Sequence, residues 1–192
     1  MLRTGLFGGS FNPIHNGHVA IARHLLLSAG LDEVWFMVSP QNPLKDHSCL
    51  LNDEKRLQLV QLALEGEPHM KACGYEFALP RPSYTWNTLC HLAIDYPDRD
   101  FILLIGGDNF QHFGLWRNAK EIMEGYKIVV YPRADAPIDT DNLPRGVTVV
   151  DTPLLNISST MVRGMVRQGK SIDGLVPPKV AQAIAEQGLY RQ

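Results

Sequence analysis

The chain has 192 residues, of which 45% are hydrophobic and 20% are charged, a composition that can bury a core within one domain and that argues against disordered and fibrous classes. Its formal net charge of -2, without a run of like charges, gives no field that would recruit nucleic acid or an anionic membrane surface. Any affinity for phosphate must therefore be local.

Cysteine usage and hydropathy predict a cytoplasmic protein. Cys49, Cys73 and Cys90 are widely spaced and lie outside any CxxC pattern, which is typical of reduced thiols rather than of a disulfide framework. No stretch approaches the roughly 18 apolar residues of a membrane span, and the first residues lack the pattern of a secretion signal. We therefore expect no contact with a membrane.

The first predicted strand, residues 2–7, leads directly into the segment GGSFNPIHNGH at 8–18, and helical periodicity follows. Gly8 and Gly9 let a ligand approach the backbone, and a helix that opens near residue 16 offers N–H groups and the positive end of its dipole to an anion. His15 and His18 are three residues apart, so both rings can donate to phosphate oxygens from one side of the first turn. The segment predicts a phosphate site.

Two other interpretations of this segment stay open. The histidine spacing also permits a metal pair, but zinc would need a third Cys, His or carboxylate ligand, and the sequence has no second cluster of suitable spacing. A glycine turn without any ligand would leave Gly17 unexplained, because glycine in a first helical turn weakens a helix unless something approaches closely. We expect no metal bound by protein ligands alone.

Further elements alternate along the middle of the chain. Strands are predicted at residues 33–38, 70–77, 101–105, 126–131 and 147–151. Asn52 is expected to cap one crossover helix, and Ser83 or Thr85 to cap another. Taken alone, Lys45 is expected to be a solvated loop lysine. Trp116 alone is more typical of a core residue than of a residue that stacks on a ligand. Residues 134–145 predict a surface loop.

The segment ISSTMVR at 157–163 opens the helix predicted at 158–168. Its hydroxyl side chains suit helix capping. Arg163 is harder to explain, because a cation in the first turn opposes the helix dipole and costs a few tenths of a kcal/mol unless a bound anion reverses the local field. This segment is therefore a second candidate phosphate site.

The alternation of elements predicts an α/β fold with a Rossmann-like, doubly wound, mainly parallel sheet. Helices predicted at 158–168 and 178–187 form a small C-terminal helical cap over about 156–192, and residues 1–192 are expected to form a single domain. Polar segments at 8–18, 39–45, 106–108 and 156–163 all follow strands. Such sheets bind ligands at the carboxyl ends of their strands, so we expect these segments to converge.

Residues 8–18 resemble the GxFxPxHxGH signature of the nucleotidyltransferase superfamily, whose HxGH element engages the triphosphate of ATP or CTP, and 157–163 match its ISSTxxR motif, which grips the β- and γ-phosphates. Residues 39–45 resemble the superfamily's PxxxPxxK loop. The resemblance implies that the catalytic residues are His15, His18, Lys45 and Arg163. It implies that ATP is bound by Gly8, Gly9, Ser10, Phe11, Gly106, Asp108, Ile157, Ser158, Ser159 and Thr160.

The segment SYTWNTL at 83–89 resembles the SYTxDTL element of bacterial nicotinate-nucleotide adenylyltransferases, with Asn87 where the family usually has Asp. In that family the start of this helix receives the pyridine carboxylate, and a downstream tryptophan stacks on the pyridine ring. The resemblance implies that Tyr84, Thr85, Trp116 and Arg133 bind the acceptor. A helix N-terminus prefers a carboxylate to a neutral amide, which agrees with this role.

The expected activity is transfer of AMP from MgATP to nicotinate mononucleotide, with magnesium entering only as MgATP. The acceptor's own phosphate, largely ionised at pH 7, would be the nucleophile, so no activated side chain is required. Two alternatives remain at this point: a related transferase with another acceptor, such as nicotinamide mononucleotide or phosphopantetheine, and a non-catalytic nucleotide sensor.

Overall fold

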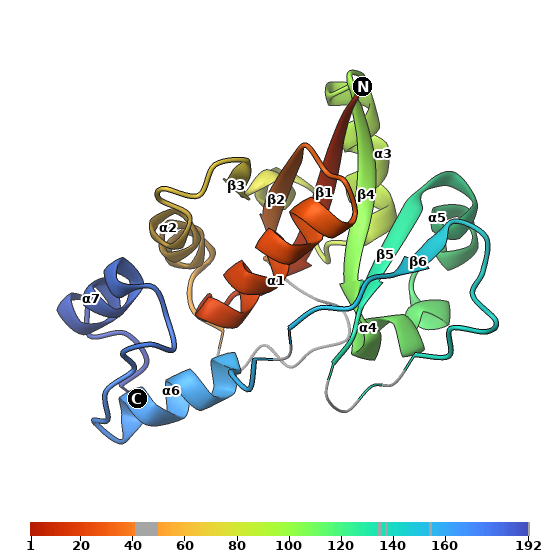
Figure 1. Ribbon diagram of the computed structural model, residues 1–192. Helices are drawn as coiled ribbons and strands as arrows, with labels where there is room; N and C mark the ends of the chain where they lie inside the picture. The colour runs from red at the N-terminus through yellow and green to blue at the C-terminus, as the bar shows by residue number, and fades with distance from the viewer. Residues whose placement is uncertain (41–49, 134–135, 137, 154, 192) are drawn as a thin grey trace.

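The computed structural model describes residues 1–40, 50–133, 136, 138–153 and 155–191. Six strands form one sheet in the order β3-β2-β1-β4-β5-β6, and all neighbouring pairs are parallel (Figure 1). The strands are β1 (Leu2–Gly9), β2 (Glu33–Val38), β3 (Met70–Cys73), β4 (Arg99–Gly106), β5 (Lys127–Tyr131) and β6 (Val147–Val149). Strand order reverses between β1 and β4, which confirms the predicted doubly wound Rossmann-like sheet.

Helices cover both faces of the sheet (Figure 1). They are α1 (Asn16–Ser28), α2 (Asp53–Ala63), α3 (Thr85–Asp95), α4 (Gly107–Gln111), α5 (Ala119–Gly125), α6 (Ser159–Arg167) and α7 (Pro178–Glu186), with short 3-10 helices η1 (Tyr75–Ala78) and η2 (Phe113–Leu115). Leu6 and Phe7, neighbours in β1, belong to opposite core clusters because successive strand side chains alternate between faces. α1, α2, α6 and α7 contribute to the cluster around Phe7, and α3 and α5 to the one around Leu6.

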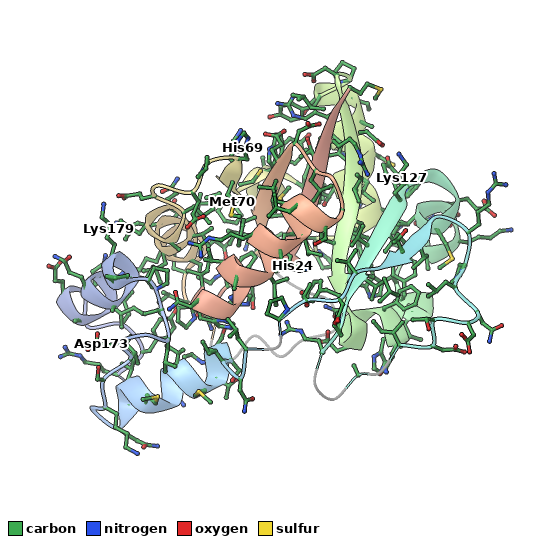
Figure 2. All side chains as sticks on the ribbon, viewed as in Figure 1. His24, His69, Met70, Lys127, Asp173 and Lys179 are labelled. Atoms are coloured by element: carbon green, nitrogen blue, oxygen red, sulfur yellow. The ribbon has the colours of Figure 1, made fainter. Side chains whose placement is uncertain are left out.

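The C-terminal helices share the core of the first face. Val162 of α6 and Val180 and Ile184 of α7 are buried in the same cluster as Leu25 of α1. On the surface, Lys179 of α7 forms an ion pair with Glu65, which follows α2 (Figure 2). These contacts attach the cap to the side of the sheet that carries the start of α1.

Some predicted element bounds are wrong. The third strand ends at Cys73 rather than at residue 77, because Cys73 already pairs with Met37, one residue before β2 ends. The chain then turns into η1. The short helices α4 and α5, of 5 and 7 residues, were not predicted, since so few residues show no helical periodicity. In the described part of the chain, no helix has the length and apolar character needed to cross a bilayer.

Candidate active site

Three adjoining cavities lie along the carboxyl ends of the strands. We call them the central cavity, of about 300 Å³, the inner cavity, of about 100 Å³, and the outer cavity, of about 850 Å³. The central cavity is lined by the 8–18 segment together with Ile157, Ser158, Ser159, Thr160, Arg163 and Arg133. The inner cavity is lined from β4, η1 and α3 and by Trp116. The outer cavity is lined from α4 and by Pro153, Leu155, Asn156, Ile157, Ser158 and Met161.

The three cavities adjoin, because they share lining residues. Gly8, Gly9 and Ser10 line both the central and the inner cavity. Ile157 and Ser158 line both the central and the outer cavity. The first loop and the start of α6 thus meet where the strand order reverses, as the polar strand-end segments predicted.

The central cavity is electropositive. Arg133 and Arg163 line it, and none of the described residues in its wall is acidic. The Arg163 guanidinium is oriented by bonds to the Asn12 carbonyl oxygen, at 2.7 Å, and to Thr160 Oγ1, at 3.3 Å. Ser159 Oγ donates to the Pro13 carbonyl oxygen at 2.8 Å, which ties the start of α6 to the first loop. Such a wall suits a multiply charged anion.

Residues His15 and His18 lie together at the start of α1, as their spacing predicted. Their rings stack with centroids 3.6 Å apart. The backbone N–H of His15 donates to His18 Nδ1 at 3.2 Å, and an accepting Nδ1 carries no proton, so the His18 proton lies on Nε2. Burial, assisted by the positive charge of Arg133, lowers the pKa of His15 to about 4. His15 is therefore a neutral ring at pH 7, which can donate only one hydrogen bond.

This shift makes folding stability depend on pH. Below about pH 6.5 the unfolded chain protonates His15, whereas the folded chain does so only near pH 4. Acidification therefore stabilises the unfolded state, and we expect His15 to remove about 2 kcal/mol of unfolding free energy between pH 7 and pH 5. Urea unfolding at the two pH values measures the loss, which should be smaller by that amount in His15→Gln.

An exposed histidine provides the control for this measurement. His91→Gln, on the exposed surface of α3, controls for the effect of a histidine-to-glutamine change as such on the unfolding free energy. If His15→Gln and the parent lose the same free energy between pH 7 and pH 5, His15 does not titrate as its burial requires.

Gly8 and Gly17, near the two ends of the 8–18 segment, have different surroundings. A Cβ on Gly8 would meet nothing within 4 Å, so this backbone is open to a ligand. A Cβ on Gly17 would lie 3.0 Å from His15 Nδ1. Gly17 therefore makes room for the His15 ring. Something does approach this glycine closely, as expected, but it is the His15 side chain rather than a ligand.

At the start of α6 the structure confirms the capping role and corrects the dipole argument. Ser158 is the N-cap, and its side chain accepts from the backbone N–H of Met161 at 3.1 Å. Because α6 begins at Ser159, Arg163 lies in the second turn rather than the first. The dipole penalty invoked for it falls off within the first turn, so its contacts with Asn12 and Thr160, not the dipole, explain its position.

The start of α3 faces the inner cavity without a side-chain cap. Tyr84 is the N-cap and Thr85 the first helical residue, so the predicted cap by Ser83 or Thr85 was wrong. Thr85 and Trp116 line the cavity. Tyr84 lines none of the three cavities, and its ring lies under the Arg117 guanidinium, with 5.0 Å between the guanidinium carbon and the ring centroid. A direct ligand contact by the Tyr84 side chain is therefore not supported.

Glu76 is a site residue that sequence reasoning missed. It is 5% exposed, lines the inner cavity, and accepts from Thr88 Oγ1 at 2.7 Å through one carboxylate oxygen. Within the described part of the chain, its Oε2 and the Nε1 of Trp116 are buried without a hydrogen-bond partner. The cavity thus holds one acceptor and one donor that a ligand could satisfy. Glu76 was missed because a strand was expected over residues 70–77, whereas Glu76 lies in η1.

The remaining predicted residues lie toward the outer cavity. Asp108 and Arg133 both line it, with Arg133 Nε 3.7 Å from Asp108 Oδ1. Gly106 makes room for this pair, because a Cβ there would lie 2.5 Å from Asp108 Oδ1. Lys45 lies outside the described residues, as does Cys49. Among the residues that are described, no group of three or more His, Cys, Asp or Glu could hold a metal ion.

Comparisons with known proteins identify the family. A family model of cytidylyltransferase-like proteins matches residues 6–165. The chain is 49% identical over 185 residues to a protein of Bacteroides fragilis named probable nicotinate-nucleotide adenylyltransferase, covering 96% of this chain and 92% of that one. It is 46% identical, over the same shares of the two chains, to a protein of the same name from Bacteroides thetaiotaomicron.

A solved structure shares the fold. Nicotinic acid mononucleotide adenylyltransferase of Plasmodium falciparum, in complex with NaAD, superimposes with a TM-score of 0.81 at 17% identity over 99% of this chain and 98% of that one. On the sequence matches, the chain belongs to the family of nicotinate-nucleotide adenylyltransferases.

Proposed function

We propose that this chain transfers the adenylyl group of ATP to nicotinate mononucleotide, as a single cytoplasmic domain. An oxygen of the mononucleotide's phosphate attacks the α-phosphorus of ATP. The bond between that phosphorus and the oxygen bridging to the β-phosphate breaks, so pyrophosphate leaves and a dinucleotide forms. The observation that carries this proposal is the arginine-lined central cavity, whose described lining residues include no acid, between two flanking cavities.

In this proposal the central cavity binds the triphosphate. Arg163 and the N–H groups at the start of α6 neutralise the leaving pyrophosphate, and His18 donates to the phosphate on which charge accumulates. Ser158 and Thr160 orient the leaving group, and open space at Gly8 lets a phosphate approach the backbone. Catalysis then consists of placing two anions in line and stabilising charge, because the attacking phosphate needs no general base.

The inner cavity receives the pyridine end of the acceptor. The first turn of α3 has no side-chain cap, so its backbone N–H groups are suited to a carboxylate, which the helix dipole also favours. Trp116 would stack on the pyridinium, where an indole face gains about 0.5–2 kcal/mol from a cation. Opposite, the outer cavity with Asp108 and Ile157 accommodates the adenosine.

Magnesium fits this site as a companion of ATP. Mg²⁺ keeps several waters and is commonly held by one or two carboxylates together with substrate phosphates. Asp108, which lines the outer cavity and pairs with Arg133, a residue that lines both the outer and the central cavity, is the carboxylate placed to assist. When bound, the ion would neutralise phosphate charge in the transition state.

The acceptor preference follows from the uncapped helix start and tests the proposal. With saturating MgATP, kcat/KM should be at least about tenfold higher for nicotinate mononucleotide than for nicotinamide mononucleotide, because about 1.4 kcal/mol of helix-terminus preference for a carboxylate is a factor of ten. Pyrophosphate release measures both values, with phosphopantetheine as a third acceptor.

The outcomes separate the candidate functions. Equal values for the two mononucleotides would show that the α3 start does not select a carboxylate. A higher rate with phosphopantetheine would assign another acceptor. ATP binding without pyrophosphate release from any of them would show a nucleotide sensor rather than a transferase.

A further inference from the structure

Arg56 of α2 is a fully buried arginine that the proposed reaction does not use directly. Its side chain is 0% exposed, although arginine is almost never fully buried unless it is paired. Burial lowers the pKa of its guanidinium, and the bond to Asp53 opposes that shift. A buried cation is retained only where its partners compensate the loss of water, so the partners indicate its role.

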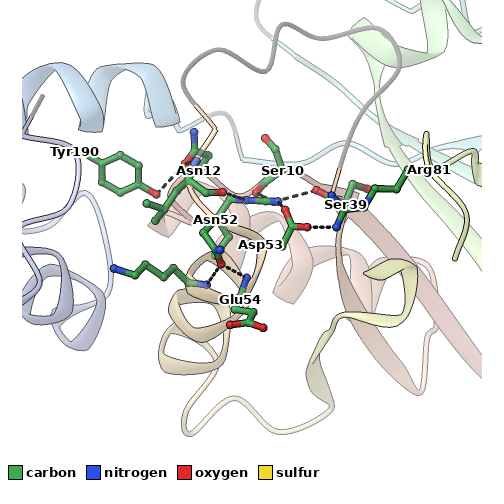
Figure 3. Close-up of polar contacts among 11 residues, drawn as sticks. Ser10, Asn12, Ser39, Asn52, Asp53, Glu54, Arg81 and Tyr190 are labelled. Atoms are coloured by element: carbon green, nitrogen blue, oxygen red, sulfur yellow. Dashed lines mark hydrogen bonds and ion pairs between the residues drawn. The ribbon is translucent and has the colours of Figure 1, made fainter. Parts of the chain in front are cut away.

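Two of those partners lie just beyond the ends of two neighbouring strands (Figure 3). Arg56 Nη1 donates to the carbonyl oxygen of Ser10, at 2.6 Å, and to that of Ser39, at 3.0 Å. Ser10 follows β1 and Ser39 follows β2, and both residues line the central and the inner cavity. Nε donates to the Leu51 carbonyl oxygen at 2.8 Å. A planar guanidinium can serve these divergent acceptors at once, which the point charge of lysine cannot reproduce.

A second ion pair extends this contact toward α3. Arg56 Nη2 lies 2.6 Å from Asp53 Oδ1, and Arg81 Nη2 lies 2.6 Å from Asp53 Oδ2. Four residues after Arg81 the chain enters α3 at Thr85, which lines the inner cavity. One carboxylate therefore joins the loops of the central cavity to the segment that leads into the proposed carboxylate-binding helix (Figure 3).

We propose that Arg56, Asp53 and Arg81 form a positioning unit that sets the spacing between the ATP loops and the acceptor end of the site. This inference rests on the proposed function. In-line transfer needs the reacting atoms about 3–3.5 Å apart, and a misplacement of about 1 Å costs on the order of 10²-fold in rate. Arg56, Asp53 and Arg81 line none of the three cavities themselves, so losing the unit should impair the alignment of the two substrates more than the binding of either.

The test compares turnover with separate binding of each substrate. We expect Arg81→Gln to lower kcat about tenfold and Arg56→Lys about 100-fold. The dissociation constants of ATP alone and of nicotinate mononucleotide alone, measured by calorimetry, should change less than threefold. Arg81 is 55% exposed, so its variant should fold even if Arg56→Lys does not. Arg23→Gln, which breaks the exposed Arg23–Glu67 pair away from the cavities, should leave kcat unchanged.

A double variant tests whether the pair acts as one unit. In an Asp53→Asn background, Arg81→Gln should lower kcat no further, since the shared carboxylate is already lost. Retained kcat in Arg81→Gln, or a parallel loss of kcat and of both binding constants, would overturn the positioning role. If the parent chain itself releases no pyrophosphate, the proposed function fails, and this inference with it; an active parent with an unaffected Arg81→Gln refutes the inference alone.

Discussion

Replacing His18 by alanine is expected to lower kcat about 10²- to 10³-fold, the usual loss when one preorganised donor to a developing anion is removed. His18 lines the central cavity, and its Nδ1 accepts from the His15 N–H, which directs its proton to Nε2. Alanine is compatible with the third position of α1. Loss of the His15 bond and of the ring stack should lower the unfolding free energy by about 1 kcal/mol. Pyrophosphate release at saturating substrates measures the effect.

A second histidine of α1 provides the matched control. His24 lies farther along the same helix, away from the cavities (Figure 2). His24→Ala should retain the kcat of the parent chain. A folded His18→Ala protein with unchanged turnover would contradict the assignment of His18 as a charge-stabilising residue, and equal losses in both variants would point to a general effect on α1.

Replacing Arg163 by glutamine should lower kcat/KM for ATP by a similar factor, about 10²- to 10³-fold. Arg163 is one of two arginines in a wall whose described residues include no acid, so its charge has no nearby substitute except Arg133. Glutamine can still donate to the Asn12 carbonyl oxygen, which isolates the loss of charge from the loss of that contact. The measurement is the dependence of initial rate on ATP concentration at saturating nicotinate mononucleotide.

Arg167, exposed in the last turn of the same helix, is the matched control. Arg167→Gln removes the same single positive charge as Arg163→Gln but leaves the cavity wall intact, so its kcat/KM for ATP should stay within about twofold of the parent value. Equal losses in the two variants would show a long-range charge effect, and an unaffected Arg163→Gln would remove Arg163 from the triphosphate site.

Much of the fold could be predicted because the inner strands β2, β1, β4 and β5 are buried on both faces and therefore appear as largely apolar runs. The end of β3 could not, because it depends on where its neighbour β2 stops pairing. Helices α4 and α5 are too short to show a period. Asn52 was predicted as the cap of α2, and its side chain does accept from the Glu54 and Lys55 N–H groups.

The candidate site, like the fold, could be predicted from the sequence only in part. Strand-end loops such as 8–18 could be predicted because neighbouring residues alone determine a glycine turn and a helix start. Tyr84 could not be placed, since its ring turns to Arg117 rather than to a cavity. Arg56 stands in the charged run DEKR, where nothing distinguishes it from a solvated helical arginine.

Amino-acid order alone was sufficient for the α/β class, for the family and for naming the segments 8–18 and 157–163 as candidate phosphate sites, because backbone N–H groups, glycine turns and motif spacing are local properties. Only the packed structure decided that His15 is neutral, that Gly17 accommodates its ring, and that Arg56 joins two loops. Burial and hydrogen-bond partners depend on contacts between residues that are far apart in the chain. They exist only once α1, α2 and the C-terminal helices have packed against the sheet.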